Sequence, residues 1–469
     1  MTTAKGGPQT TSAARPTASV NPASAEYIVA PIPSGLSNYS KDAYAESAHF
    51  RIWGEKNANT TIGLTHLEGT WDCFVNRLGW RSSGLSEFDT ANKGPYYKTN
   101  VFVYPGLIGA TGITAEDIAT GLGFIAVLPD WVNYVGVMSH EYGHVMTIAE
   151  TSWWNGVNTA GWRETIAQFV SETYNNSPFC AASRTAANDT NTGGTLFQPS
   201  ALLSNSWNTL IDATNSETSL GNQYFAWPFL EYLTYNLDNY SGFGQNFMLN
   251  MFNNYSASAN ETPFHTINRM AGNAKTTVQE IVGRYWARMA YVDYGSYIAQ
   301  NYFQYLKPTI DYNNTLPTGA ANTYKVIPAR APKYMGSSII PLNNLGSSVT
   351  ARVSAATAFT ATLAVMGASG TVRYIELTPT TGTGVVKTVT EAIASGEQAT
   401  LVVANTPTTL LMYDASQVST GPVSVGLDFT FVLTGATTGR GNKSWLRLCP
   451  SSSTSSREIF SLPQSLQRQ

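Results

Sequence analysis

The sequence contains few charged residues, since Asp, Glu, Lys and Arg make up only 12% of its 469 residues. A soluble protein usually carries roughly 25%. The 27 Lys and Arg residues nearly balance the 30 Asp and Glu residues, and they form no basic block. Because such a chain has no basic surface to neutralise a phosphate backbone, its charge excludes nucleic acid as a partner.

Long apolar runs are also missing, and none approaches the ~18–20 residues that cross a bilayer. The sequence therefore predicts no membrane span. Residues 1–25 lack the apolar core of a secretion signal as well. The rest of the chain is low in charge and rich in Tyr, Trp, Asn and Thr. This composition is typical of exported proteins, and on that basis alone we expect a secreted, extracellular protein.

Cysteine is rare, with three residues at positions 73, 180 and 449. So few cysteines exclude both a disulfide-dense scaffold and a zinc site built from thiolates. They allow one bridge, which we predict between Cys73 and Cys180, and they leave Cys449 over.

Apolar residues, by contrast, make up 43% of the chain, enough to fill large cores, and the length favours more than one domain. We expect an α+β protein in which a mixed α/β domain over residues 41–305 precedes an all-β sandwich over residues 306–435. Alternating apolar residues near the end of the second region, such as Phe429, Phe431 and Leu433, favour that sandwich. The polar residues 1–40 and 436–469 are predicted to be disordered tails.

Local patterns predict the main elements of the first domain. The expected strands cover residues 49–53, 100–104 and 123–128. The expected helices cover residues 65–80, a buried stretch after Asp130, and residues 161–174, 224–237 and 278–294.

The buried helix after Asp130 contains His140-Glu141-Tyr142-Gly143-His144, an H-E-x-x-H motif. Residues four apart lie one turn apart on the same helix face, so both imidazoles can reach one metal ion. Glu141 lies at the edge of that face, close enough to contact a metal-bound water without being a ligand. The structural alternative is a pair of core histidines whose nitrogens are hydrogen-bonded to the backbone.

A catalytic zinc ion has three protein ligands and one open position. Two carboxylates are candidates for the third ligand. Glu150 lies six residues after His144. A ligand at this spacing occurs in the pattern H-E-x-x-H-x-x-G-x-x-H, where a glycine turns the chain sharply, but this chain has Thr147 at the position of the glycine. Glu164 lies twenty residues after His144 at the start of the next helix. We therefore predict a single zinc ion bound by His140, His144 and Glu164.

An H-E-x-x-H helix followed by a glutamate about twenty residues later resembles the gluzincin class of zinc metallopeptidases, the thermolysin-like arrangement. The resemblance covers about residues 48–180. It implies a zincin-like catalytic domain, zinc ligands at His140, His144 and Glu164, and a general base at Glu141. It also implies that an edge strand near residues 123–128 pairs with the substrate, while an ordinary buried strand is the equal alternative for these residues. Gln168 departs from the pattern, because thermolysin-like enzymes place there an aspartate that orients a ligand histidine.

These residues predict hydrolysis of peptide bonds in a peptide or protein substrate, with Glu141 taking a proton from the attacking water. A second donor would stabilise the oxyanion. Tyr224 is the candidate we name first, and three alternatives stay open: Tyr174, Arg163 and His265. One rival function is a catalytically inactive binding protein whose sandwich contacts a glycan or a cell surface. The other is a zinc hydrolase of non-peptide amides or esters.

Overall fold

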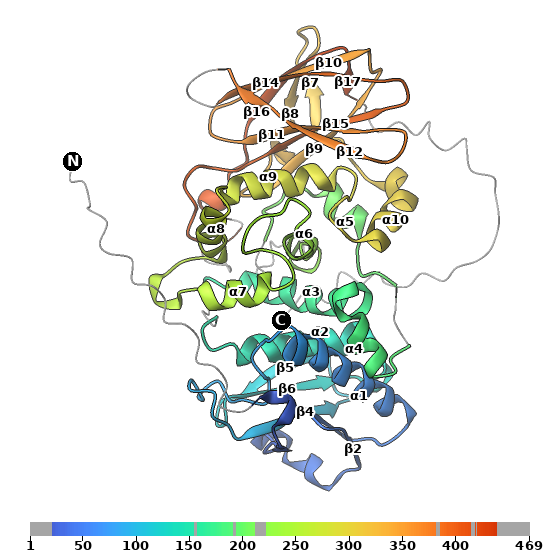
Figure 1. The fold of residues 1–469 in the computed structure, drawn as a ribbon, viewed down its shortest axis with the longest axis vertical. Helices are drawn as coiled ribbons and strands as arrows, with labels where there is room; N and C mark the ends of the chain where they lie inside the picture. Colours follow the sequence, from blue (N-terminus) through green and yellow to red (C-terminus); the bar gives the residue numbers. More distant parts are fainter. Residues whose placement is uncertain are drawn as a thin grey trace, which may run out of the picture.

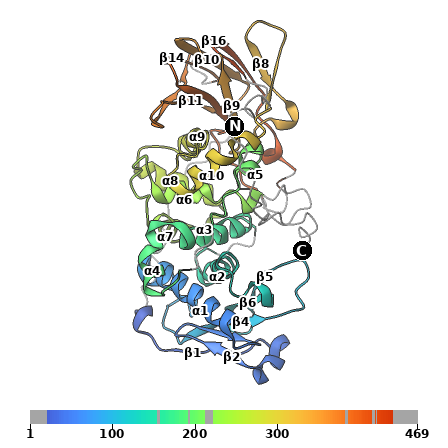
Figure 2. The same cartoon turned by 90° about the vertical axis from the view of Figure 1, so that its right-hand side faces the viewer.

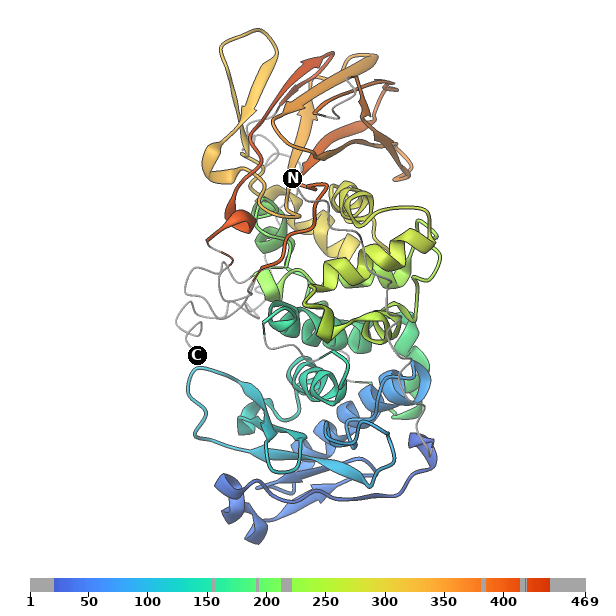
Figure 3. The same cartoon turned by 90° about the vertical axis from the view of Figure 1, so that its left-hand side faces the viewer.

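The computed structural model describes residues 21–153, 157–190, 194–211, 222–380, 385–413, 418 and 420–438. Three layers follow one another along the long axis of the molecule (Figure 1). A mixed sheet with its helices lies at one end, a group of helices lies in the middle, and a β-sandwich lies at the other end. The two views turned by 90° show the same order (Figures 2 and 3). The α+β class expected from the sequence is confirmed.

The first layer contains the mixed sheet and the helices next to it in the chain. Its elements are β1 (Tyr27–Val29), β2 (Tyr44–Glu46), β3 (Phe50–Trp53), α1 (Ala58–Trp71), β4 (Tyr96–Val103), β5 (Gly112–Asp117), β6 (Leu122–Val127), α2 (Val135–Ala149) and α3 (Arg163–Asn176). The helices of the middle layer are α4 (Ala181–Ala186), α5 (Pro199–Ser204), α6 (Pro228–Tyr235), α7 (Phe247–Asn254), α8 (Pro263–Asn273), α9 (Val278–Met289) and α10 (Tyr297–Leu306).

The first sheet has the strand order β2-β3-β4-β6-β5, with β1 paired to β4. Strands β3, β4 and β6 are parallel, whereas β5 runs antiparallel to β6. Among the described residues no strand pairs with the other side of β5, so β5 is the edge. The prediction that residues 123–128 form the edge strand is therefore wrong. These residues form β6, whose nearly continuous burial is typical of an inner strand.

The prediction of a disordered tail over residues 1–40 is also wrong for the part that the structure describes. Residues 27–29 form β1, which pairs in parallel with residues 96–98 of β4. Tyr27 is buried and its hydroxyl lies 2.8 Å from the hydroxyl oxygen of Ser82. One large aromatic side chain is thus enough to hold this polar segment on the sheet, whereas residues 1–20 lie outside the described residues.

Two helices begin elsewhere than expected. Helix α1 begins at Ala58, seven residues before the predicted start, because Asn57 and Thr60 form a capping box. It passes at Trp71 into a π-helical turn over residues 72–77. The stretch predicted as one helix over residues 224–237 is divided, and α6 begins only at Pro228, whose fixed φ suits the first helical position. Tyr224 consequently ends a short 3-10 turn before α6.

The sandwich consists of two antiparallel sheets. One sheet contains β13 (Thr378–Pro379), β14 (Val386–Ala392), β10 (Ser348–Ala355), β16 (Phe429–Thr434), β8 (Thr323–Val326) and β7 (Thr315–Pro317), in that order. The other contains β12 (Val372–Glu376), β11 (Thr360–Met366), β15 (Gln398–Ala404), β9 (Ser337–Asn343) and β17 (Thr437–Thr438). Phe429, Phe431 and Leu433 point inward from β16 as predicted. The predicted tail begins at Ala436, but Thr437 and Thr438 still pair with β9, and residues 439–469 lie outside the described residues.

One sheet of the sandwich packs its outer surface against the helices. The residues between the two sheets form one apolar cluster. Ala364 of β11 and Val402 of β15 lie on the opposite surface of their sheet and belong to the large core of the preceding layers. Helix α9 lies across this face (Figure 1). Its residue Gly283 packs against Thr360, and the Trp286 indole donates a hydrogen bond of 2.8 Å to the Met335 carbonyl.

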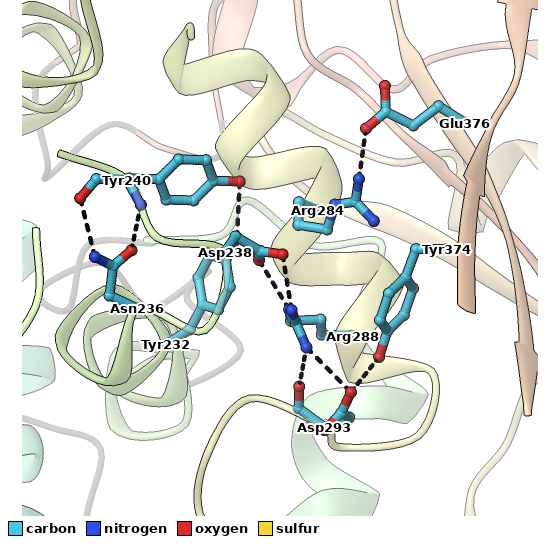
Figure 4. Close-up of polar contacts among 9 residues, drawn as sticks. All are labelled: Tyr232, Asn236, Asp238, Tyr240, Arg284, Arg288, Asp293, Tyr374 and Glu376. Atoms are coloured by element: carbon cyan, nitrogen blue, oxygen red, sulfur yellow. Dashed lines mark hydrogen bonds and ion pairs between the residues drawn. The ribbon is translucent and has the colours of Figure 1, made fainter. Parts of the chain in front are cut away.

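A polar network also joins α9 to the sandwich (Figure 4). Arg288 donates two hydrogen bonds, of 2.8 and 2.7 Å, to the carboxylate of Asp238. It donates a third, of 3.0 Å, to Asp293, which also accepts a bond of 2.7 Å from the Tyr374 hydroxyl of β12. This guanidinium is buried and bonds two carboxylates at once, so the sandwich is fixed to the helices by specific geometry as well as by apolar contact.

Cys73 and Cys180 form the disulfide predicted from the sequence, with their Cα atoms 5.2 Å apart. The bridge joins the turn after α1 to the segment before α4, while Cys449 lies outside the described residues. In the part of the chain that the structure describes, no helix is long and apolar enough to cross a membrane.

Candidate metal centre

Helix α2 presents the H-E-x-x-H motif. One side of α2 is fixed to the sheet by Tyr142, which is fully buried, packs on Phe50 with a ring distance of 4.9 Å, and lies 2.7 Å from the Ser83 hydroxyl oxygen. His140 and His144 lie one turn apart on another face, and their rings are 4.8 Å apart. Because α2 is anchored behind Tyr142, the two imidazoles have a fixed direction.

Helix α3 places Glu164 opposite these imidazoles. It approaches α2 closely at Gly143, where an added Cβ atom would lie only 2.9 Å from the Cα atom of Ala167. The Ser171 hydroxyl donates a hydrogen bond of 2.9 Å to the Gly136 carbonyl and joins the same two helices further along. The glycine of the motif therefore allows α3 to lie near enough for its first turn to reach the histidines.

Three potential ligand atoms converge at this point. The Nε2 atoms of His140 and His144 are 3.2 Å apart, and they lie 3.1 and 3.4 Å from Oε2 of Glu164. Ligands at about 2.0–2.1 Å from a tetrahedral ion are about 3.3–3.4 Å from one another. Two imidazole nitrogens and one carboxylate oxygen are also the donor types that zinc binds. His140, His144 and Glu164 therefore fit one divalent metal ion in both spacing and chemistry.

The charge of Glu164 supports this assignment. Burial would raise the pKa of Glu164, but the positive charge of His144 and hydrogen bonds from both imidazoles bring that pKa well below its usual range. Burial would lower the pKa of His144, yet the charge of Glu164 outweighs it and raises the pKa. Glu164 is thus an anion at neutral pH and offers the negative charge that a bound cation requires.

Gln168 does not take the place of the orienting aspartate. Neither its Oε1 atom nor Nδ1 of His140 has a hydrogen-bond partner among the described residues. The amide oxygen therefore accepts no hydrogen bond from a ligand candidate among the described residues. The tautomer of His140 is set without the carboxylate that usually lies behind such a ligand.

The side chain of Glu141 lies between its own helix, α2, and the edge strand β5, and 6% of the residue's surface is exposed. The Thr114 hydroxyl of β5 lies 2.9 Å from its Oε2 atom and 2.8 Å from its backbone oxygen. Gly112 of β5 is so close that an added Cβ atom would lie 2.8 Å from Cγ of Glu141. The carboxylate therefore lies beside the metal-ligand candidates and is held by a strand whose outer side pairs with no other strand among the described residues.

Tyr224, the first-named candidate for the second donor, lies against a metal-ligand candidate. Its ring lies 6.4 Å from the His140 ring at an interplanar angle of 27°. Burial, together with the charges of Glu164 and Glu141, raises the pKa of Tyr224 far above its usual value. The phenol therefore keeps its proton at neutral pH and is able to donate a hydrogen bond.

Several other candidates have structural roles. The Tyr174 hydroxyl donates to Asp189 over 2.7 Å, and His265 lies 2.9 Å from the Thr262 hydroxyl that caps α8. Glu150, the rejected third ligand, is buried and accepts a hydrogen bond of 2.8 Å from the backbone N–H of Arg81. Arg163 begins α3 beside Glu164, and burial lowers the pKa of its guanidinium.

The remaining histidines are paired away from this site. His49 lies 2.6 Å from Glu68, and His66 lies 2.7 Å from Asp189. Together with His265 they account for all histidines outside the motif, so His140 and His144 are the two histidines that face Glu164.

Strand β5 and its residues Gly112 and Thr114 were missed by the sequence analysis. The segment Gly112-Ile113-Thr114-Ala115-Glu116-Asp117 has one large apolar residue and no alternation. Its only signal is its place between two apolar strands, where a hairpin partner of β6 fits.

A family model, described as a family of unknown function (DUF6055), matches residues 37–374. The matched range includes the motif helix, Glu164, β5 and a large part of the sandwich. No curated protein and no solved structure matches the chain. Since the model covers more than half of the sequence, the chain belongs to the DUF6055 family.

Proposed function

We propose that the protein is a zinc-dependent hydrolase that cleaves peptide bonds in peptides or proteins. The observation that carries the proposal is the convergence of His140, His144 and Glu164 on one point, with the carboxylate of Glu141 held beside them. Bound zinc would supply Lewis acidity and lower the pKa of a water molecule towards 7.

The residues of the chain have distinct roles in this reaction. Glu141 takes a proton from the attacking water as the new C–O bond forms at the peptide carbonyl. It then gives the proton to the leaving nitrogen as the C–N bond breaks. Tyr224 donates a hydrogen bond to the oxygen that develops negative charge. The outer side of β5 offers backbone groups with which an extended substrate pairs.

We also propose that the protein acts outside the cell. The disulfide between Cys73 and Cys180 supports this location, because such bridges persist in oxidising compartments. The low charge of the chain is in agreement with it.

The test uses the full-length protein and its Glu141→Gln variant. Metal content is measured by mass spectrometry, and a mixed-peptide library is digested and analysed. We expect one zinc ion per chain in both proteins and cleavage by the wild type alone, because the substituted amide keeps the shape of the side chain but cannot accept the proton. Glu376→Gln, a change at an exposed carboxylate of the sandwich, is the matched control and should cleave normally.

Two results would contradict the proposal. Absence of zinc would leave a binding protein on this scaffold, with the sandwich as the surface to test for glycans. Zinc without peptide cleavage would direct the search to non-peptide amides and esters.

A further inference from the structure

The Thr114 hydroxyl contacts two atoms of the proposed general base, Glu141, at once. Its Oγ1 atom lies 2.8 Å from the backbone oxygen of Glu141 and 2.9 Å from the Oε2 atom of the same residue. The backbone oxygen is in the interior of α2, where the helical N–H four residues later already serves it. The hydroxyl therefore leaves its proton for the carboxylate, which when ionised only accepts hydrogen bonds.

The other oxygen of the carboxylate has a different environment. Among the described residues Oε1 accepts no hydrogen bond. Its neighbour is Gly112, where an added Cβ atom would lie 3.0 Å from Oε1. The strand that donates a hydrogen bond to Oε2 thus accommodates Oε1 without a side-chain contact, because position 112 lacks a side chain.

We infer that Thr114 is a positioning residue that engages Oε2 of Glu141 and makes Oε1 the oxygen that takes and returns the proton. The inference rests on the proposed function. Protonation of Oε1 leaves Oε2 as a carbonyl-type acceptor, so the Thr114 hydrogen bond persists in both protonation states. Glu141 therefore changes charge during the reaction without losing its orientation, as a preorganised site requires.

The test compares Thr114→Val, which keeps the shape but removes the hydroxyl, with Thr114→Ser, which keeps the hydroxyl. Thr70→Val is the matched control. The Thr70 hydroxyl is also buried against α2, donates to the His66 carbonyl over 2.7 Å and lies 2.9 Å from the Ser139 hydroxyl, but it contacts neither Glu141 nor a metal-ligand candidate. Each full-length, zinc-loaded variant is assayed for zinc content, melting temperature and peptide hydrolysis at neutral pH.

For Thr114→Val we expect kcat to fall on the order of 10- to 100-fold, as for other lost partners of site residues. KM and zinc content should stay near their wild-type values. Thr114→Ser should restore kcat, and Thr70→Val should leave kcat near the wild-type value whatever it does to the melting temperature.

A wild-type kcat in Thr114→Val would overturn the inference. So would a loss of kcat that follows the melting temperature equally in Thr114→Val and Thr70→Val, or one that Thr114→Ser does not rescue. Should the wild type cleave no peptide, the proposed function fails and a second readout decides on Thr114. With ¹³C-labelled glutamate carboxyls, the Glu141 signal, identified by its loss in Glu141→Gln, should change its chemical shift at one fixed neutral pH in Thr114→Val, because Oε2 has lost its donor, and should return in Thr114→Ser. An unchanged signal in Thr114→Val would overturn the inference.

Discussion

Gly143 of α2 faces Ala167 of α3 so closely that a Cβ atom at position 143 would lie 2.9 Å from the Ala167 Cα atom. Real Cβ atoms do not approach backbone that closely. The same approach brings the first turn of α3, and with it Glu164, to the imidazoles of α2. One missing methyl group therefore determines the distance between the two halves of the ligand set.

Gly143→Ala should force α3 away from α2 and separate Glu164 from His140 and His144. We expect a loss of about 1–3 kcal/mol in the free energy of unfolding. Zinc affinity, measured by competition with a chelator, should fall as well. Gly272→Ala is the control, because Gly272 is also helical but has no atom within 4 Å of an added Cβ, so its stability should be unchanged or slightly increased. Equal effects of the two substitutions would contradict the close-contact explanation.

Glu164→Gln should weaken zinc binding by about 100-fold or more, since the amide offers a neutral oxygen in place of an anion. Adding zinc should then raise the melting temperature of the wild type much more than that of the variant, because a ligand stabilises the folded state in proportion to its affinity. Differential scanning fluorimetry with and without a chelator measures both. If zinc stabilises Glu164→Gln as strongly as the wild type, Glu164 is not a ligand.

Arg288→Met should destabilise the protein by about 3–5 kcal/mol, because it leaves the carboxylates of Asp238 and Asp293 without their shared cation (Figure 4). Arg284→Met, one turn earlier on α9, removes a pair with the exposed Glu376 and a contact with the Tyr374 ring, and should cost about 1 kcal/mol. Urea unfolding of both variants gives the comparison. Similar losses would show that the position of Arg288 in the network is unimportant.

Arg288 also gives this network a pH dependence. Burial would raise the pKa of Asp238, but hydrogen bonds and charge from Arg288 lower it below its usual value. The stabilisation from this pair is therefore complete above the ordinary aspartate pKa and is lost as the pH falls through the lower folded-state pKa. In Arg288→Met this acid-side loss should be smaller than in the wild type.

Glu116 of β5 should make the protein less stable as the pH rises. Burial, a hydrogen bond with Glu87 and the charges of Glu87 and Asp117 raise the pKa of Glu116 to about 7. The folded state thus holds this proton more tightly than the unfolded chain. Its stabilising effect is complete below the ordinary glutamate pKa and disappears as the pH rises through about 7.

Glu116→Gln, which stays neutral, should flatten the decline in melting temperature between pH 5 and pH 8. The carboxyl is only partly buried, so the difference should be about 1 kcal/mol or less. Glu376→Gln should keep the wild-type decline. A wild-type decline in Glu116→Gln would show that other groups cause it.

Features with a local signal could be predicted from the sequence. The H-E-x-x-H spacing on an apolar helix identified His140 and His144, and the absence of a turning glycine at Thr147 directed the third ligand to Glu164 rather than Glu150. The alternation over Phe429 to Leu433 identified a sandwich strand in the same way. Each of these depends on residues within one or two turns or along one strand.

Features that arise from pairing with distant segments could not be predicted. Tyr27 lies in a polar part of the sequence. It is buried because β1 pairs with β4, about seventy residues later in the chain. Thr114 has no periodic neighbours, and its contact with Glu141 exists only once β5 has paired with β6. The edge strand was wrongly predicted at residues 123–128 for the same reason. Whether a strand is inner or at the edge depends on which other strand pairs with it.

The common core of the helices and the sandwich has a consequence for biosynthesis. The core around the candidate metal centre includes Tyr334 and Val423, which a ribosome adds long after His144 and Glu164. Domains generally fold as units while the chain is made, N-terminal part first. Here the N-terminal part lacks its last packing partners until nearly the whole chain has been translated. A fragment released early from a stalled ribosome would therefore lack part of the core to which α2 and α3 belong.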